Sequence, residues 1–132
     1  MTAQDPEVVR RGSGGPWEDA YGYARVVVAG SFAFVSGCTS TGPDGVIGVG
    51  DAAVQARTAF GIALGALADV GIAADRVVRT RMYVIRREDS EIVGRVHGEL
   101  FGSIRPAATL VVVAGLLHPD HLVEVEVVAL AS

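Results

Sequence analysis

Residues 104–130 read I-R-P-A-A-T-L-V-V-V-A-G-L-L-H-P-D-H-L-V-E-V-E-V-V-A-L, and they predict two β-strands joined by a loop. The first strand, at residues 107–114, is almost continuously apolar, which is typical of a strand buried on both faces. The second, at residues 122–130, alternates, so that Glu124 and Glu126 share one face with aliphatic residues. A face that mixes carboxylates with aliphatic side chains indicates a subunit interface, a ligand cleft, or both.

More strands are predicted upstream of this pair. Runs of β-branched and aromatic residues bounded by glycine predict a hairpin and a separate strand, at residues 23–29, 32–36 and 77–85. A short edge strand is expected at residues 8–13, followed by a loop that begins at Trp17. The turn residues within residues 38–50 predict a second loop.

Two helices are predicted between the strands. The first covers about residues 51–70, because Asp51 is a good N-cap and apolar residues then recur at helical spacing. Gly61 and Gly65 within it each cost about 1 kcal/mol relative to alanine, and they indicate the close approach of another backbone. The second helix covers about residues 89–101.

This order of elements predicts a single α/β (α+β) domain over residues 1–132, in which residues 1–6 are frayed. A mixed sheet with two helices packed on one face is the simplest arrangement. The opposite face would carry charges that cannot be buried alone, and a homotrimer would pair them at its seams. These charged residues are Arg79, Arg81, Glu124 and Glu126.

The composition of the chain limits the classes of function that we expect. The chain has 132 residues, of which 50% are hydrophobic, and its net charge is −4. The 11 positive charges are all scattered arginines, so no nucleic-acid partner is expected. A single cysteine, Cys38, excludes an internal disulfide, and the three histidines lack the spacing of metal ligands, so we expect no metal. No signal peptide or membrane span is evident, and a cytoplasmic protein is expected.

Several motifs together resemble one known family. They are Y-G-Y-A-R at 21–25, F-V-S-G at 34–37, V-V-R-T-R-M-Y-V at 77–84, H-G-E-L-F-G at 97–102, R-P-A-A-T at 105–109 and L-V-E-V-E-V-V-A at 122–129. In their order and spacing they are similar to the Rid (reactive intermediate deaminase, RidA/YjgF-like) family. The resemblance covers roughly residues 16–131 and implies a chorismate-mutase-like fold. It also implies a homotrimer with a ligand cleft at each subunit interface.

The resemblance implies particular site residues. Glu124 falls where the family carries a cleft glutamate that positions or activates the attacking water. Tyr23 falls on the cleft tyrosine, and Gly37 on a glycine whose backbone lines the cleft. The alternative for Glu124 is a structural ion pair with Arg79 or Arg81.

One residue departs from the family pattern. Deaminase-competent members carry an arginine directly after Pro-Ala, which pairs with the substrate carboxylate, but Ala108 stands here. Arg105 lies three residues earlier and would point to the other face of a strand. Arg81, on a neighbouring strand, is another candidate guanidinium. We expect the cleft to be bounded by Tyr23, Ala108 and Leu110.

Two functions remain open on the sequence. The first is a Rid-like hydrolase that acts on a small imine, enamine or related carbonyl-derived metabolite and needs no cofactor. The second is a trimer that binds a small metabolite without turnover. Glu124 and Tyr23 favour the hydrolase, whereas Ala108 favours the binding protein.

Overall fold

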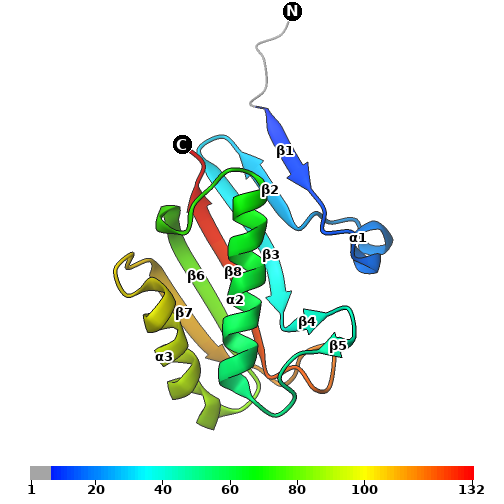
Figure 1. The fold of residues 1–132 in the computed structure, drawn as a ribbon, viewed down its shortest axis with the longest axis vertical. Helices are drawn as coiled ribbons and strands as arrows, with labels where there is room; N and C mark the ends of the chain where they lie inside the picture. The colour runs from blue at the N-terminus through cyan, green and yellow to red at the C-terminus, as the bar shows by residue number, and fades with distance from the viewer. Residues whose placement is uncertain (1–6) are drawn as a thin grey trace, which may run out of the picture.

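The computed structural model describes residues 7–132. Its central element is a six-stranded mixed sheet (Figure 1). Adjacent strands are antiparallel except β6 and β7, which are parallel. The mixed sheet predicted from the sequence is therefore confirmed. In spatial order the strands are β1 (Val8–Arg11), β2 (Val26–Ala29), β3 (Phe32–Thr39), β8 (Val123–Leu130), β6 (Val77–Val84) and β7 (Ala107–Val112).

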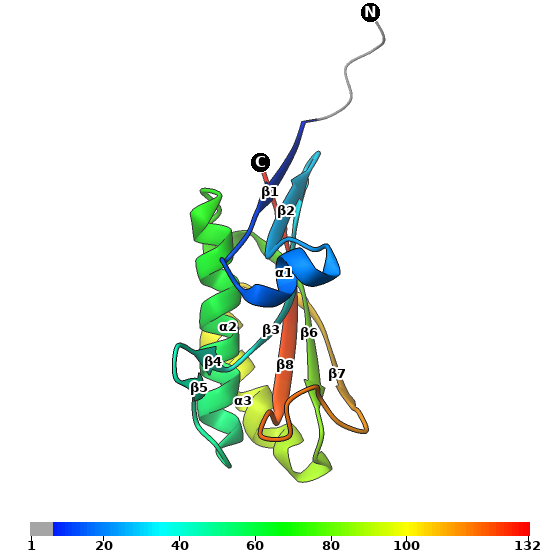
Figure 2. The same cartoon turned by 90° about the vertical axis from the view of Figure 1, so that its right-hand side faces the viewer.

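Two long helices, α2 (Ala52–Asp69) and α3 (Ser90–Phe101), cover one face of this sheet (Figure 2). Helix α2 begins as predicted, because Asp51 Oδ1 accepts a hydrogen bond from the Val54 amide at 3.0 Å. Gly71, with φ of 78°, follows its C-terminus. The opposite face of the sheet has no helix packed over it in Figure 2, and we call it the open face.

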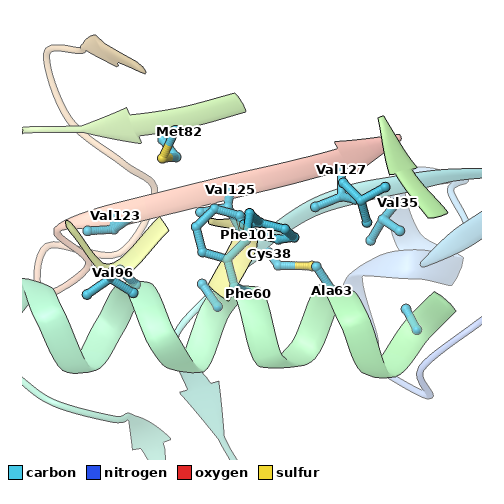
Figure 3. Packing of buried hydrophobic residues seen from close by; sticks show 14 of the residues in the cluster. Val35, Cys38, Phe60, Ala63, Met82, Val96, Phe101, Val123, Val125 and Val127 are labelled. Atoms are coloured by element: carbon cyan, nitrogen blue, oxygen red, sulfur yellow. The ribbon is translucent and has the colours of Figure 1, made fainter. Parts of the chain in front are cut away.

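The core lies between β8 and α2 (Figure 3). Val123, Val125 and Val127 point from the strand toward the helix, where Phe60 and the small residue Ala63 receive them. Full burial of each valine or phenylalanine contributes about 1.5–3 kcal/mol. Since alternate residues of a strand face opposite ways, this packing holds Glu124 and Glu126 on the open face.

A buried amide fixes the start of β8. The Gln55 side chain is fully buried on α2, and its Nε2 donates to the carbonyls of Gly48 and Asp120 at 3.1 and 2.9 Å. Its Oε1 accepts from the Leu122 amide at 2.8 Å. Gln55 therefore attaches the loop before β8 to the helix. The same contacts help to fix the position of Glu124, which follows Leu122 by two residues.

The prediction of a loop that begins at Trp17 is wrong, because this segment forms the short helix α1 (Pro16–Tyr21). Pro16 occupies the first helical position, where a proline loses no hydrogen bond, and Gly22 ends the helix with φ of 75°. Trp17 and Tyr21 stack at 5.5 Å between ring centroids.

The loop expected at residues 38–50 is also more ordered than predicted. β3 continues to Thr39, and a small hairpin follows around the predicted turn. Its strands are β4 (Thr41–Gly42) and β5 (Gly45–Val46). Two short 3-10 helices, η1 (Ala74–Arg76) and η2 (Arg87–Asp89), complete the described elements.

Two further expectations are wrong within this chain. Strand β7 is not buried on both faces: it is an edge strand of the sheet, five of its six residues are exposed, and it ends at Val112. Gly61 and Gly65 do not mark a close backbone approach, because both are exposed and a Cβ at either would meet no atom within 4 Å. An apolar run or a glycine pair in the sequence indicates a contact. It does not indicate whether this contact is within the chain or with another molecule.

Candidate functional site

Glu124 lies on the open face, on the central strand β8 and near the end at which this strand begins. In the strand register it stands beside Thr39 of β3 and Tyr83 of β6. Its carboxylate contacts the backbone of Gly37: a Cβ at that glycine would lie 2.5 Å from Glu124 Oε2. The close approach of strand and carboxylate therefore requires the absence of a side chain at position 37.

The environment of Glu124 favours its protonated form. Partial burial raises the pKa of the carboxyl above its usual range, and the neighbouring Glu126 raises it further. The Arg25 guanidinium opposes both effects and lowers the pKa. A carboxyl with a raised pKa is a stronger base once ionised, which suits proton transfer near neutral pH.

The predicted alternative, an ion pair between Glu124 and Arg79 or Arg81, is not the pairing that the structure shows. Arg81 Nη1 lies 3.6 Å from Glu126 Oε1, and the Tyr83 hydroxyl donates to the same oxygen at 2.7 Å. This hydrogen bond is the main reason that the pKa of Tyr83 is raised. Arg79 instead donates to Thr109 Oγ1 at 2.6 Å. Glu126 thus contacts Arg81 and Tyr83, and Glu124 lies next to these three residues.

Gly37 belongs to a β-bulge in β3. The register of β3 against β8 shifts between Val35 and Cys38, so Ser36 and Gly37 together stand opposite the single residue Glu126, and β3 has one extra residue in the ladder. The shift returns Cys38 to the core side, where the thiol is 2% exposed and burial raises its pKa. Cys38 is therefore a small buried residue and not an activated nucleophile.

Tyr23 lies at a hollow of about 510 Å³ between β1, α1 and β2. Its side chain is 40% exposed, and the Arg25 guanidinium lies 5.8 Å from its ring centroid. Glu124 does not line this hollow, although Ser36 of the bulge does. The other lining residues are Arg10, Glu18, Asp19, Gly22, Ala24 and Val27.

The three site residues predicted around β7 lie apart from Glu124. Ala108 is level with Thr80 in the parallel ladder, and Leu110 with Met82, both of which are buried on the helix side. Leu110 packs against the core. Arg105, which has a positive φ of 61°, lines a separate hollow of about 320 Å³ beside α3. This chain alone therefore does not bring these residues to Glu124.

Residues that the sequence analysis missed surround the bulge. Arg25 donates to the carbonyls of Ser36 and Gly37, and Glu18 lies behind it at 4.0 Å. The motif Y-G-Y-A-R contained this arginine, but a β-bulge has no sequence period that would have revealed its contacts.

Within residues 7–132, no group of three or more histidine, cysteine, aspartate or glutamate side chains is placed to hold a metal ion. In the same part of the chain, no helix is long and apolar enough to cross a membrane.

Comparison with known proteins identifies the family. The family model described as Endoribonuclease L-PSP matches residues 17–131. An uncharacterized protein of Streptomyces coelicolor is 45% identical over 124 residues, which are 93% of this chain and 92% of that protein.

Solved structures agree. A Mycobacterium tuberculosis member of the YjgF/YER057c/UK114 family is 37% identical, with a TM-score of 0.85 over 94% of this chain and 99% of that one. Escherichia coli TdcF, solved with bound serine, is 24% identical, with a TM-score of 0.77 over 98% of both chains, and shows the fold alone. The chain therefore belongs to the Endoribonuclease L-PSP family, the family of the RidA/YjgF proteins.

Proposed function

We propose that this protein hydrolyses a small imine, enamine or related carbonyl-derived metabolite at a cleft that includes Glu124. The observation that carries the proposal is the state of this carboxyl. It is partly buried, its pKa is raised, and the arginines of the open face bind other partners. A structural carboxylate would be expected to have a cationic partner, whereas a general base must keep its lone pairs for water.

The chemistry needs only water and a positioned base. Glu124 takes a proton from water while the oxygen attacks the carbon of the C=N bond, and the nitrogen gains a proton. The resulting carbinolamine then breaks its C–N bond, so that ammonia leaves and a carbonyl remains. An enamine enters the same sequence after it tautomerises to the imine. No electron is transferred to or from an external group.

The cleft of this proposal lies between subunits of a homotrimer. The hollow at Tyr23 does not include Glu124, and the open face that carries Glu124 has no helix over it. A neighbouring subunit would supply the second wall. To contribute to the cleft, the neighbouring subunit's copy of Ala108, Leu110, Arg81 or Arg105 would have to lie on this second wall. Their contribution is part of the proposal.

The test is hydrolysis of two small imines, a neutral one and a 2-aminoacrylate-type one, measured by release of ammonia above the spontaneous rate. Glu124→Gln should lower the rate by about 10²–10⁴-fold, the usual contribution of general acid–base catalysis. Glu99→Gln, which changes an exposed glutamate on α3 paired with Arg57, should retain the wild-type rate. The proposal fails if Glu124→Gln is as active as wild type. Loss of the assembled mass in that variant would support a structural role instead.

The pH profile gives a second measurement. Because the base acts as a carboxylate and its pKa is raised, activity should be absent at low pH. It should rise through a midpoint above the ordinary glutamate range. A midpoint in the ordinary range would mean that another group is titrating.

The second candidate is a trimer that binds a small metabolite without turnover, and Ala108 favours it. The position carries a methyl group where deaminase-competent relatives are expected to carry a guanidinium. The relative TdcF was solved with bound serine, which supports a small-molecule site for either candidate. Saturable binding of a small acid, without release of ammonia from any imine tested, would favour the binding protein.

We do not extend the ribonuclease description of the family model to this chain. It has no lysine and a net charge of −4, and Arg81 on the open face is paired with Glu126. An RNA-binding surface needs several cations free to contact phosphates.

A further inference from the structure

Arg25 is built into the fold in a way that an ordinary surface arginine is not. Its side chain is only 15% exposed. Nη1 donates to the carbonyl oxygens of Ser36 and Gly37 at 3.1 and 2.6 Å, and lies 3.4 Å from Cys38 Sγ. One guanidinium therefore contacts three successive residues of β3.

These three residues form the irregular part of the strand. The bulge removes Ser36 and Gly37 from the regular ladder with β8. Buried backbone carbonyls need a donor, and a charged donor makes the stronger hydrogen bond. Arg25 supplies this donor to both carbonyls, so it stabilises the bulge in its present shape.

The same bulge contacts Glu124. Glu124 Oε2 lies where a Cβ at Gly37 would approach it to 2.5 Å. The bulge therefore determines how close the backbone comes to the carboxylate. A change in the conformation of Ser36 and Gly37 would change both the space and the exposure of Glu124.

Arg25 is itself held from behind. Its Nε lies 4.0 Å from Oε2 of Glu18, a carboxylate of α1 that is buried with 7% exposure. The Ser13 amide donates to both Glu18 oxygens at 2.9 and 3.2 Å, and the Ser13 hydroxyl donates to Oε2. A continuous set of polar contacts thus runs from Ser13 through Glu18 and Arg25 to the bulge.

We infer that Arg25 is a positioning residue, which clamps the Ser36–Gly37 bulge against Glu124 and is oriented by Glu18. The inference deepens the proposed function, because it says what sets the geometry and charge of the proposed base. The clamp itself can be measured without any substrate.

The clamp also acts on ionisation. The groups that face Glu124 are Glu126 on its own strand, Arg25 before β2 and Tyr83 on β6, whereas the nearby Cys38 of β3 points to the core side. Of these, Arg25 is the one that lowers the pKa of Glu124, and Glu126 raises it. Removal of the guanidinium should therefore move the midpoint of the activity–pH profile upward.

Cys38 provides the first readout, because this single thiol is buried next to the bulge, and opening of the bulge should expose it to a reagent. Arg25→Met keeps a chain of similar bulk but has no donor. Arg25 also lowers the pKa of Cys38, so the rates are compared at an equal thiolate fraction. On that basis Arg25→Met should raise the rate of modification by a thiol-specific disulfide reagent about tenfold or more, since local opening controls the reactivity of buried groups. Arg25→Lys, with one ammonium in place of the guanidinium fork, should give an intermediate rate. Glu18→Gln should raise the rate less than Arg25→Met.

Arg57→Met is the matched control, because this arginine pairs with Glu99 on the helix side, away from the bulge. It should react at the wild-type rate. A folded Arg25→Met protein whose thiol reacts within about twofold of wild type would overturn the clamp, since that difference is too small for a lost pair of hydrogen bonds. If Arg25→Met does not fold, wild-type thiol rates in both Arg25→Lys and Glu18→Gln would overturn it equally.

The second readout is activity, and it separates the two proposals. Arg25→Met should lower kcat and shift the pH midpoint upward, with partial recovery in Arg25→Lys. A change in KM alone would contradict positioning of Glu124. If wild type hydrolyses no imine, the proposed function fails while the thiol comparison still decides whether Arg25 holds the bulge.

Discussion

Gly37 offers the most local test of the site. Alanine should be tolerated by the backbone, because Gly37 is not among the glycines with positive φ, but its Cβ would lie 2.5 Å from Glu124 Oε2. The flexible carboxylate should move aside and leave the fold intact. We expect Gly37→Ala to lower hydrolysis about 10–100-fold, as for other small displacements of reacting groups. Melting temperature and imine hydrolysis should be measured beside Gly94→Ala, which meets open space on α3. Unchanged activity in Gly37→Ala would show that this contact does not position Glu124.

Ala108 allows a test of substrate choice. A charge-assisted hydrogen bond contributes about 1.5–3 kcal/mol, and a bidentate arginine supplies two of them to a carboxylate. We therefore expect wild type to turn over 2-imino acids weakly, and Ala108→Arg to raise that turnover, measured as kcat/KM. If wild type already matches arginine-bearing relatives, Arg81 or Arg105 must reach the cleft. Alanine substitution at each would then show which one does so.

At the scale of single residues, the sequence predicts site residues that belong to a motif and misses residues that are defined by their contacts. Glu124 and Tyr23 were predicted because they fall within motifs of the family. Arg25 also lies in a motif, but its role depends on part-buried carbonyls 11 and 12 residues away, which a bulge removes from the ladder. Nothing in the local pattern of β3 predicts which carbonyls leave the ladder.

Among the elements, α2 carries two glycines whose replacement should stabilise the protein. Gly61 and Gly65 are exposed and a Cβ would meet no atom within 4 Å, so alanine removes a helix penalty of up to about 1 kcal/mol at each. The double variant Gly61→Ala/Gly65→Ala should therefore melt several degrees higher, measured by calorimetry. A lower melting temperature together with a lower assembled mass would mean that another subunit packs on these glycines, as the sequence first suggested.

The two helices, the strands closest to the core and the edge strand β1 were predicted well, whereas the burial of the other edge strand, β7, was not. Helix α2 has both an N-cap and a clear apolar period, and β8 alternates over its whole length. Strand β7 is apolar on both faces, yet it lies at the edge of the sheet with one neighbour. Sequence patterns report that a side chain avoids water, and they do not say which molecule covers it.

For the whole molecule, the open face is the feature that calls for a partner. Phe32, Phe34 and Val111 are 43%, 46% and 41% exposed, and in the strand register they lie beside Leu130, Val128 and Tyr83. A group of exposed apolar residues rimmed by polar ones is typical of an interface. The family resemblance implies a trimer, and a chain of 13.6 kDa with 50% hydrophobic residues would gain by burying this face.

We therefore predict that the protein in solution has about three times its chain mass of 13.6 kDa, measured by light scattering at micromolar concentration. Val111→Asp places a charge on the open face and should reduce the mass to that of a monomer, because an unpaired buried charge costs several kcal/mol. Circular dichroism should still show the fold, since Val111 is 41% exposed in the single chain. Ile92→Asp is the control: Ile92 on α3 is 40% exposed, so the same charge there should leave the mass unchanged. A monomer mass for wild type would remove the intersubunit cleft, and Glu124 would then face open solvent.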